Sequence, residues 1–249
     1  MAGHSHAANV ARRKNAVDAK RAKIFSKCAK AIISAVKQGG PDPEQNLKLR
    51  YAIEKAKGDN MPKDNIQRAI KSASGDKGGD MEELTYEGYA PGGIAVMVSA
   101  LTDNRARTAS DLKHIFDKRG GNMGAPGSVG FLFQFRSVFV VETGGRSEDQ
   151  LTELALEVGC DDVEVGSEAS TFYADATEFL PVKEGLEADG LEFISAEIGY
   201  VPENDVEVES KADAKKILAL VDALEDNDDV QNVYANFSIE DAWLDELEA

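Results

Sequence analysis

The sequence contains few of the residues that build disulfide frameworks or metal sites. Its 249 residues include two cysteines, three histidines and one tryptophan. Cys28 and Cys160 lie far apart and form no CxxC pair, so we expect two reduced thiols rather than a disulfide. His4 and His6 have no third ligand nearby, and we predict no bound metal.

Long apolar runs are also missing. The segment from Gly93 to Leu101 is among the longest, and it is far shorter than the about 20 residues that span a bilayer. The first residues show neither the apolar stretch nor the cleavage pattern of a signal peptide. Because 42% of the residues are hydrophobic, the chain can build real cores, and its length fits two or three domains. We therefore expect a globular cytoplasmic protein.

No side chains form a recognisable catalytic set. His114 has Asp111 and Asp117 three residues away on a predicted helix, but no nucleophile with a partnering base is identifiable, and a surface salt bridge explains the trio. One glycine-rich stretch lacks the Gly-Lys-Ser/Thr of a phosphate loop and precedes a strand, so its glycines are interpreted as turn residues. These are Gly121, Gly124, Gly127 and Gly130. We predict no enzymatic activity and no cofactor.

Positive charge is scarce overall but concentrated at one end. The formal net charge is −17, yet residues 1–75 hold 16 Lys and Arg against 6 Asp and Glu, a local charge of +10. The remaining residues hold 12 cations against 39 acids, a charge of −27. Such asymmetry is typical of a chain with one polyanion-binding end, since like charges on a small domain oppose its compaction unless a partner offsets them.

The basic third has the apolar spacing of three helices. Residues 24–36 carry an apolar stripe at three- and four-residue intervals that ends at Gly39-Gly40. Asp42-Pro43-Glu44 predicts the cap and first turn of a second helix, and Pro62 predicts the start of a third that runs to Ala73. Gly75 to Asp80 is rich in turn residues and predicts a linker.

Beyond residue 81, strand and helix patterns alternate, which predicts α+β lobes with helices packed on small, mostly antiparallel sheets. The predicted strands are 93–101, 129–135, 138–142, 163–165, 171–174, 193–200 and 230–237. The predicted helices start at Thr108 or Ser110 and run to Lys118, then span 147–158, 181–188 and 211–224. Phe131, Phe133 and Phe135 alternate on one of these strands, and core packing explains them better than RNA stacking.

Several sequence blocks resemble the YebC/PmpR family over nearly the full length. They are MAGHS at 1–5, Arg13-Lys14, DAKR at 18–21, KIF at 23–25, NMPKDNI at 60–66, YEGY at 86–89, PGG at 91–93, TDNR at 102–105 and GGN at 120–122. The resemblance implies a three-helix domain over 1–78, a discontinuous α+β domain over 79–135 plus 204–240, an inserted α+β domain over 136–203 and an acidic tail over 241–249. His6-Ala7 departs from the Lys-Trp pair usual in relatives, which removes a cation and a stacking aromatic.

Members of that family are described as DNA-binding transcriptional regulators, as mitochondrial translation activators and as proteins linked to stalled ribosomes. The resemblance and the basic cluster together predict phosphate contacts from ten cations. These are Arg12, Arg13, Lys14, Lys20, Arg21, Lys23, Lys27, Lys30, Lys63 and Arg105. Lys20, Lys23, Lys27 and Lys30 share one helix flank, and Arg105 precedes a predicted helix N-terminus, where a salt bridge with Asp103 is the alternative.

Three functions follow from these observations. The first is a monomeric, ribosome- or RNA-associated translation factor whose basic domain binds ribosomal RNA or tRNA. The second is a DNA-binding transcription regulator, with the second and third helices as a helix-turn-helix and Lys63, Asn65, Gln67 and Arg68 facing bases. The third is a scaffold in which the acidic lobes bind basic proteins. We expect no membrane association.

Overall fold

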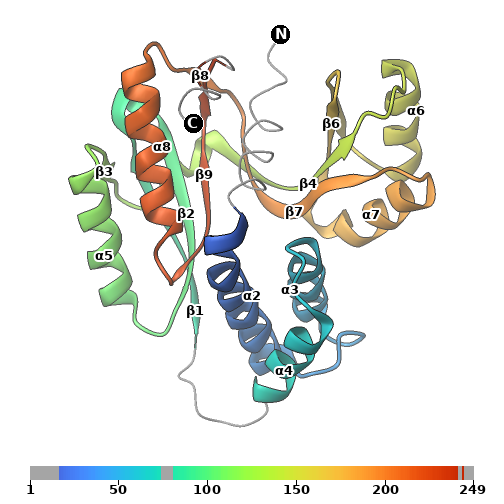
Figure 1. Ribbon diagram of the computed structural model, residues 1–249, viewed down its shortest axis with the longest axis horizontal. Helices are drawn as coiled ribbons and strands as arrows, with labels where there is room; N and C mark the ends of the chain where they lie inside the picture. The colour runs from blue at the N-terminus through green and yellow to red at the C-terminus, as the bar shows by residue number, and fades with distance from the viewer. Residues whose placement is uncertain (1–16, 74–80, 241–242, 244–249) are drawn as a thin grey trace. The chain divides into compact units, whose positions relative to one another are not determined.

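The computed structural model describes residues 17–73, 81–240 and 243, and the side chains of 17–20 lie outside that description. The predicted linker at 75–80 and nearly all of the acidic tail also lie outside the described residues. Two compact units are present: residues 21–133 with 202–249 form one, and residues 134–201 belong to the other. Figure 1 shows the elements of each unit.

Three helices form the first part of the larger unit, as the apolar spacing predicts. They are α2 (Val17–Gly39), α3 (Leu47–Gly58) and α4 (Lys63–Ala73). Ile32 and Leu49 are fully buried between them, and Ile66 contributes from α4. The stripe on α2 therefore packs inward and leaves the polar flank of the helix to contact other groups.

The start of the second helix differs from the prediction. Asp42 caps only a turn, in which its Oδ1 accepts from the Glu44 backbone N–H at 3.0 Å. Asn46 is the helix cap: its Oδ1 accepts from Leu49 N, and its Nδ2 donates to Ala35 O and Gly40 O. The Asn46 amide is buried and satisfies carbonyl groups at the end of α2 as well as an N–H at the start of α3. It is therefore a more effective helix cap than the exposed Asp42.

A four-stranded sheet in the order β3-β1-β2-β9 forms the second part of the larger unit. Its strands are β1 (Glu82–Tyr89), β2 (Ala95–Thr102), β3 (Asn122–Met123) and β9 (Val230–Ala235), and their pairings are antiparallel. Helices α5 (Arg105–Lys118) and α8 (Lys211–Glu225) lie beside each other over one face (Figure 1). Phe116 and Leu220 are fully buried against Val96 and Val98 of β2.

Two details of this sheet were not predicted. Strand β1 is half exposed and carries three glutamates, so its apolar alternation is too weak to predict a strand. In the structure it pairs with β2 along its whole length. Helix α5 begins earlier than Thr108, because Asn104 caps it by accepting from Arg107 N. Thr108 is instead fully buried in the first turn.

Short elements complete the larger unit. A 3-10 turn, η1 (Pro91–Gly93), connects β1 to β2, and a second, η2 (Gly130–Leu132), leads to β4. Strands β8 (Val206–Glu207) and β10 (Phe237–Ser238) form a parallel pair, so the predicted final strand 230–237 is divided into β9 and β10.

The smaller unit has a sheet in the order β5-β6-β4-β7. Its elements are β4 (Phe133–Glu142), α6 (Glu148–Val158), β5 (Asp162–Val165), β6 (Ala169–Asp175), η3 (Ala176–Glu178), α7 (Phe179–Ala188) and β7 (Phe193–Pro202). Ser147 and Gln150 form a capping box at the start of α6. The rings of Phe139 and Phe179 stack at 5.2 Å, which joins α7 to the sheet. The chain therefore has the predicted α+β fold.

The prediction for the alternating phenylalanines is wrong for two of the three rings. Phe133 is buried, but Phe131 is 71% exposed and Phe135 is 55% exposed. The physical reason for Phe131 is that η2 takes it out of the strand, whereas Phe135 stays near the start of β4. Phe135 contacts Tyr200 with ring centroids 5.0 Å apart.

Gly121 is a position where any side chain should destabilise the larger unit. A Cβ there would lie 2.6 Å from Tyr89 O and 3.0 Å from Leu220 Cδ2, because the chain leaving α5 runs directly against β1. We expect Gly121→Ala to lower the free energy of unfolding by about 2 kcal/mol. Urea denaturation measures this. Gly58→Ala is the control, since its Cβ meets nothing within 4 Å and should change stability by less than about 1 kcal/mol; equal effects would contradict the steric argument.

Candidate nucleic-acid interface

The predicted phosphate-binding cations fall into several groups in the structure. Arg12, Arg13 and Lys14 lie outside the described residues, as does the side chain of Lys20. Arg21 is exposed on α2. Lys23, Lys27 and Lys30 follow one another along a flank of α2, and we call them the lysine row. Lys63 begins α4 and Arg105 begins α5, so these two cations belong to separate elements.

The lysine row contacts an acidic segment within the same unit. This segment, residues 225–229, joins α8 to β9 and contains four acids. Lys23 Nζ lies 2.6 Å from Asp226 Oδ1, Lys27 Nζ donates to Glu225 O at 2.6 Å, and Lys30 Nζ lies 2.6 Å from Asp229 Oδ1. The cations that the sequence marks most strongly are therefore bound to the chain's own oxygens.

Lys27 shows how closed this contact is. Burial lowers the pKa of Lys27 to about 8, and the nearby charges of Lys23 and Lys55 add to that effect, while Glu225 and Asp228 oppose it. Because burial disfavours the charged form of Lys27, the hydrogen bond to the Glu225 carbonyl oxygen compensates its ammonium in part.

Asp229 is the centre of a buried polar cluster that no sequence pattern indicated. Its side chain is 8% exposed. Its oxygens accept from Lys30 Nζ at 2.6 Å, from Arg107 Nη2 at 2.8 Å and from the hydroxyl groups of Thr108 at 2.8 Å and Thr102 at 3.2 Å. The cluster thus ties α2, β2 and α5 to the start of β9.

The pKa of Asp229 is well below its usual value. Burial by itself raises this pKa, but hydrogen bonds from Lys30, Arg107 and Thr108 and the charge of Lys30 outweigh burial. The carboxylate is therefore ionised and stabilised by its donors. Three of its partners, Thr108, Arg107 and Lys30, lie more than 120 residues from Asp229 in the sequence. Residue spacing along the chain could therefore not predict the cluster.

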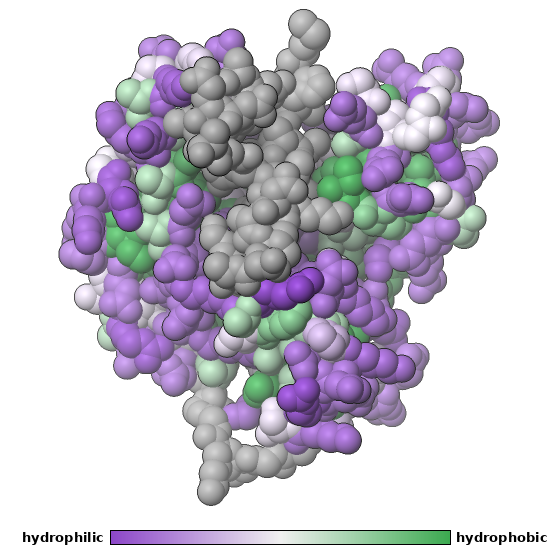
Figure 2. Space-filling model, in the orientation of Figure 1, coloured by the Kyte–Doolittle hydropathy of each residue, from purple (hydrophilic) through white to green (hydrophobic). Residues whose placement is uncertain are grey.

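The outer side of α4 is different, because its cations are exposed. Lys63, Gln67, Arg68 and Lys71 all lie in solvent, and we call these four residues the α4 face. The exposed Arg68 donates to Asn65 Oδ1 at 2.7 Å on its own helix. Figure 2 shows hydrophilic side chains over the region where α3 and α4 lie in Figure 1. This face presents three cations and an amide to solvent.

The turn between α3 and α4 is stabilised by a backbone hydrogen bond and by a buried side chain. Asn60 has φ 59°, and Met61 N donates to Ala56 O at 2.9 Å, which buries Met61 in the helical core. The thiol of Cys28 donates to Asp59 Oδ2 at 3.3 Å, and burial raises the pKa of Cys28 to about 12. Cys28 and Cys160 are free thiols, as predicted. The turn has the sequence position expected of a helix-turn-helix.

The arginines at the start of α5 have separate surroundings. Arg107 pairs with Asp103 at 3.0 Å and with Asp229 at 2.8 Å, so the salt-bridge interpretation holds for Arg107. Arg105 is exposed, and its backbone carbonyl accepts from the Tyr86 hydroxyl at 3.3 Å.

The glycine-rich stretch binds a carboxylate of the chain itself. Glu87 accepts from the backbone N–H groups of Gly127 at 2.7 Å, Val129 at 2.6 Å and Gly130 at 2.7 Å. Burial raises the pKa of Glu87, but these three hydrogen bonds outweigh it and lower the pKa. The loop therefore resembles an anion-binding nest whose occupant is internal, which agrees with its interpretation as a turn.

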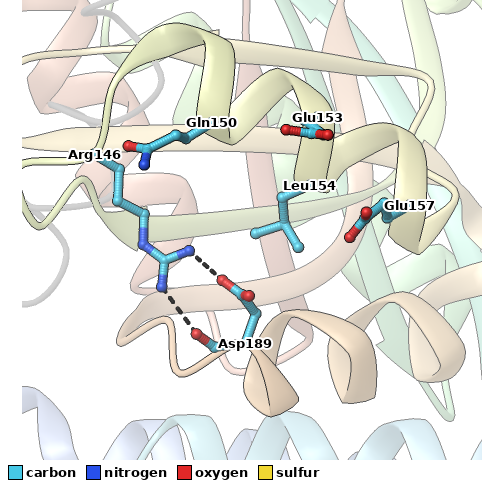
Figure 3. A pocket seen from close by; sticks show the side chains of 6 residues that line it. All are labelled: Arg146, Gln150, Glu153, Leu154, Glu157 and Asp189. Carbon is cyan, nitrogen blue, oxygen red and sulfur yellow. Dashed lines mark hydrogen bonds and ion pairs between the residues drawn. The ribbon is translucent and has the colours of Figure 1, made fainter.

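A shallow pocket in the smaller unit has a polar lining (Figure 3). Arg146 pairs with the Asp189 carboxylate and donates to Asp189 O at 2.9 Å, while Glu153, Glu157 and Leu154 line the pocket from α6. The polar groups of the pocket are carboxylates, an amide and one guanidinium. Among the described residues, no group of three or more His, Cys, Asp and Glu side chains has the arrangement of a metal site.

The chain matches two family descriptions that together cover most of its length. Residues 5–76 match the N-terminal domain of the TACO1/YebC protein, and residues 81–237 match the TACO1/YebC second and third domain. Within the described part of the chain, no helix has the length and apolarity needed to cross a membrane.

Full-length relatives agree with this match. Proteins from Trichlorobacter lovleyi and Rubrobacter xylanophilus, each named a probable transcriptional regulatory protein, are 49% and 47% identical. The alignments cover 100% and 99% of this chain and 99% of each relative. The crystal structure of a conserved hypothetical protein from Aquifex aeolicus is 48% identical, with a TM-score of 0.79 over 90% of this chain and 93% of that one. The chain therefore belongs to the TACO1/YebC family.

Proposed function

We propose that this chain is a non-enzymatic, nucleic-acid-binding regulator of gene expression that acts on RNA at the level of translation. The observation that carries the proposal is the exposed α4 face in the basic third of the chain. Three cations on one short helix offer phosphate contacts without prior rearrangement, and each contact gains free energy from counterion release.

The charge of the smaller unit supports the same proposal. Residues 134–201 hold 3 Lys and Arg against 16 Asp and Glu, a net charge of −13. Such a unit is repelled by a polyanion and leaves the basic helices to approach it. Ribosomal RNA and tRNA are the polyanions that we favour, because a charge-driven contact of this kind reads shape and phosphate rather than base sequence.

DNA binding is the alternative function, and two observations favour it. The relatives from Trichlorobacter lovleyi and Rubrobacter xylanophilus are named probable transcriptional regulatory proteins, and α3 and α4 are joined by a short turn. On α4, Gln67 is exposed and suits hydrogen bonds to base edges. The Asn65 oxygen, in contrast, accepts from Arg68, which weakens the case for base readout by this residue.

Crosslinking in living cells, followed by sequencing of bound RNA and bound DNA, tests the proposal. The wild type is compared with Lys63→Gln/Arg68→Gln/Lys71→Gln. We expect crosslinks on ribosomal RNA or tRNA that fall strongly in the variant. Crosslinks concentrated at a few promoters would establish the DNA alternative instead, and an absence of nucleic-acid crosslinks would reject both functions.

A further inference from the structure

The acidic segment presents to α2 a surface made of oxygen atoms. Besides the three closest contacts of the lysine row, Lys30 Nζ donates to Asp228 O at 3.4 Å, and Lys23 Nζ lies 3.9 Å from Asp228 Oδ1. The segment begins at the C-terminus of α8, where the helix dipole adds negative potential. Carboxylate and carbonyl oxygens thus give these ammonium groups the same kind of acceptor that phosphate oxygens would give them.

Part of this contact is open to solvent and exchangeable. The side chains of Asp226 and Asp228 are 72% and 89% exposed, and that of Lys23 is 31% exposed. Ion pairs between such exposed groups contribute little to stability. In contrast, Lys30 and Asp229 are 20% and 8% exposed and belong to the buried cluster. The exposed end of the contact therefore separates at a lower cost than the buried end.

We infer that the acidic segment is an internal competitor of nucleic acid for Lys23 and Lys27, so that these cations form a second phosphate-binding surface that opens only when a polyanion displaces Asp226 and Asp228 from Lys23 and the Glu225 carbonyl from Lys27. The inference rests on the proposed function, in which the α4 face makes the first contact. It deepens that function, because the chain then binds weakly through α4 alone and tightly once the lysine row is released.

Competition of this kind would make binding selective for ligands that carry many closely spaced phosphates. A helix row of cations left open would bind any polyanion in proportion to its charge. An internal carboxylate pair imposes a threshold, because a ligand must supply closely spaced phosphates at both the α4 face and the lysine row to replace the internal partner. Extended or structured RNA meets this condition, whereas short single oligonucleotides bind through one surface only.

Neutralising the exposed carboxylates tests the inference. Asp226→Asn/Asp228→Asn keeps the shape of the segment and leaves Asp229 in place. With a single-stranded RNA long enough to reach both the α4 face and the lysine row as the probe, we expect about tenfold tighter binding than wild type. The log–log salt slope should be steeper by about 0.7, since Lys23, the cation that pairs with these carboxylates, becomes available to one further phosphate. Adding Lys23→Gln/Lys27→Gln should cancel this gain but change wild-type affinity much less.

A control variant distinguishes competition at the lysine row from a general loss of negative charge on the unit. Asp111→Asn/Asp117→Asn removes the same charge from exposed positions of α5 in the same unit. Competition is rejected, and the proposed function stands, if both pairs of aspartate substitutions raise RNA affinity equally. The same holds if Lys23→Gln/Lys27→Gln lowers affinity equally in the wild type and in the Asp226/Asp228 variant.

The proposed function has its own test. If the wild type binds RNA and neutralising the α4 face leaves its affinity unchanged, the α4 face is not the contact surface, whatever the acidic segment does. If neither wild type nor the Asp226/Asp228 variant binds RNA, both are rejected.

Discussion

Replacing Asp229 with alanine should lower the free energy of unfolding of the larger unit by about 3 kcal/mol at neutral pH. The substitution leaves the buried hydroxyl groups of Thr102 and Thr108 without an acceptor and removes the counter-charge of Lys30 and Arg107. Lys30 and Arg107 keep some access to water, at 20% and 47% exposure, and we therefore expect the lower end of the range for broken buried ion pairs.

Urea denaturation followed by tryptophan fluorescence measures this effect. Trp243 is the single tryptophan and packs against the core of α5, α8 and the sheet, so its emission reports this unit. Asp226→Asn is the matched control, because its side chain is 72% exposed, and it should change stability by less than about 0.5 kcal/mol. A loss below about 1 kcal/mol for Asp229→Ala would show that the cluster contributes little.

The contribution of the Asp229 charge to stability has a defined pH dependence, which Asp229→Asn measures. The folded-state pKa of Asp229 lies below the unfolded value of 3.8, so the unfolded chain binds the proton more readily. The stabilisation is therefore complete above about pH 5 and is lost as the pH falls below the unfolded value toward the folded one. The stability difference between wild type and Asp229→Asn should shrink between pH 5 and 3 on this basis; a constant difference would assign the effect to packing instead of charge.

Neutralising the α4 face should weaken RNA binding about 10- to 100-fold at physiological salt. Lys63→Gln/Arg68→Gln/Lys71→Gln removes three exposed cations, and each lost phosphate contact forgoes the release of about 0.7 counterion from a single strand. The log–log salt slope should therefore fall by about 2. Fluorescence anisotropy with a labelled single-stranded RNA at several salt concentrations measures both quantities.

A variant of equal charge change provides the control for this experiment. Lys113→Gln/Lys118→Gln/Lys216→Gln removes three cations from α5 and α8, and Lys113 and Lys216 there pair with Asp117 and Asp213 on their own helices. Glutamine has nearly the helix propensity of lysine and arginine, so both variants should stay folded. A similar loss of affinity in the two variants would mean that net charge, and not the α4 face, governs binding.

The sequence by itself determined the local elements that carry their own signals. The apolar stripe of α2 and the capping box of α6 are short-range patterns, and both helices form where those patterns stand. The α+β class also followed from the alternation of strands and helices. The concentration of cations before residue 75 and the family blocks were likewise readable, since composition and motif need no knowledge of long-range contacts.

Only the tertiary structure decided which groups meet across the chain. Strand β1 is stabilised by pairing with β2 and not by its own weak alternation. Asn46 replaces Asp42 as a cap because its amide also satisfies the end of α2. Above all, the lysine row faces carboxylates about 200 residues away, and a charge pattern specifies the sign of a partner but not its identity. The free energy of such a pair depends on burial and geometry, which arise only when distant segments pack together.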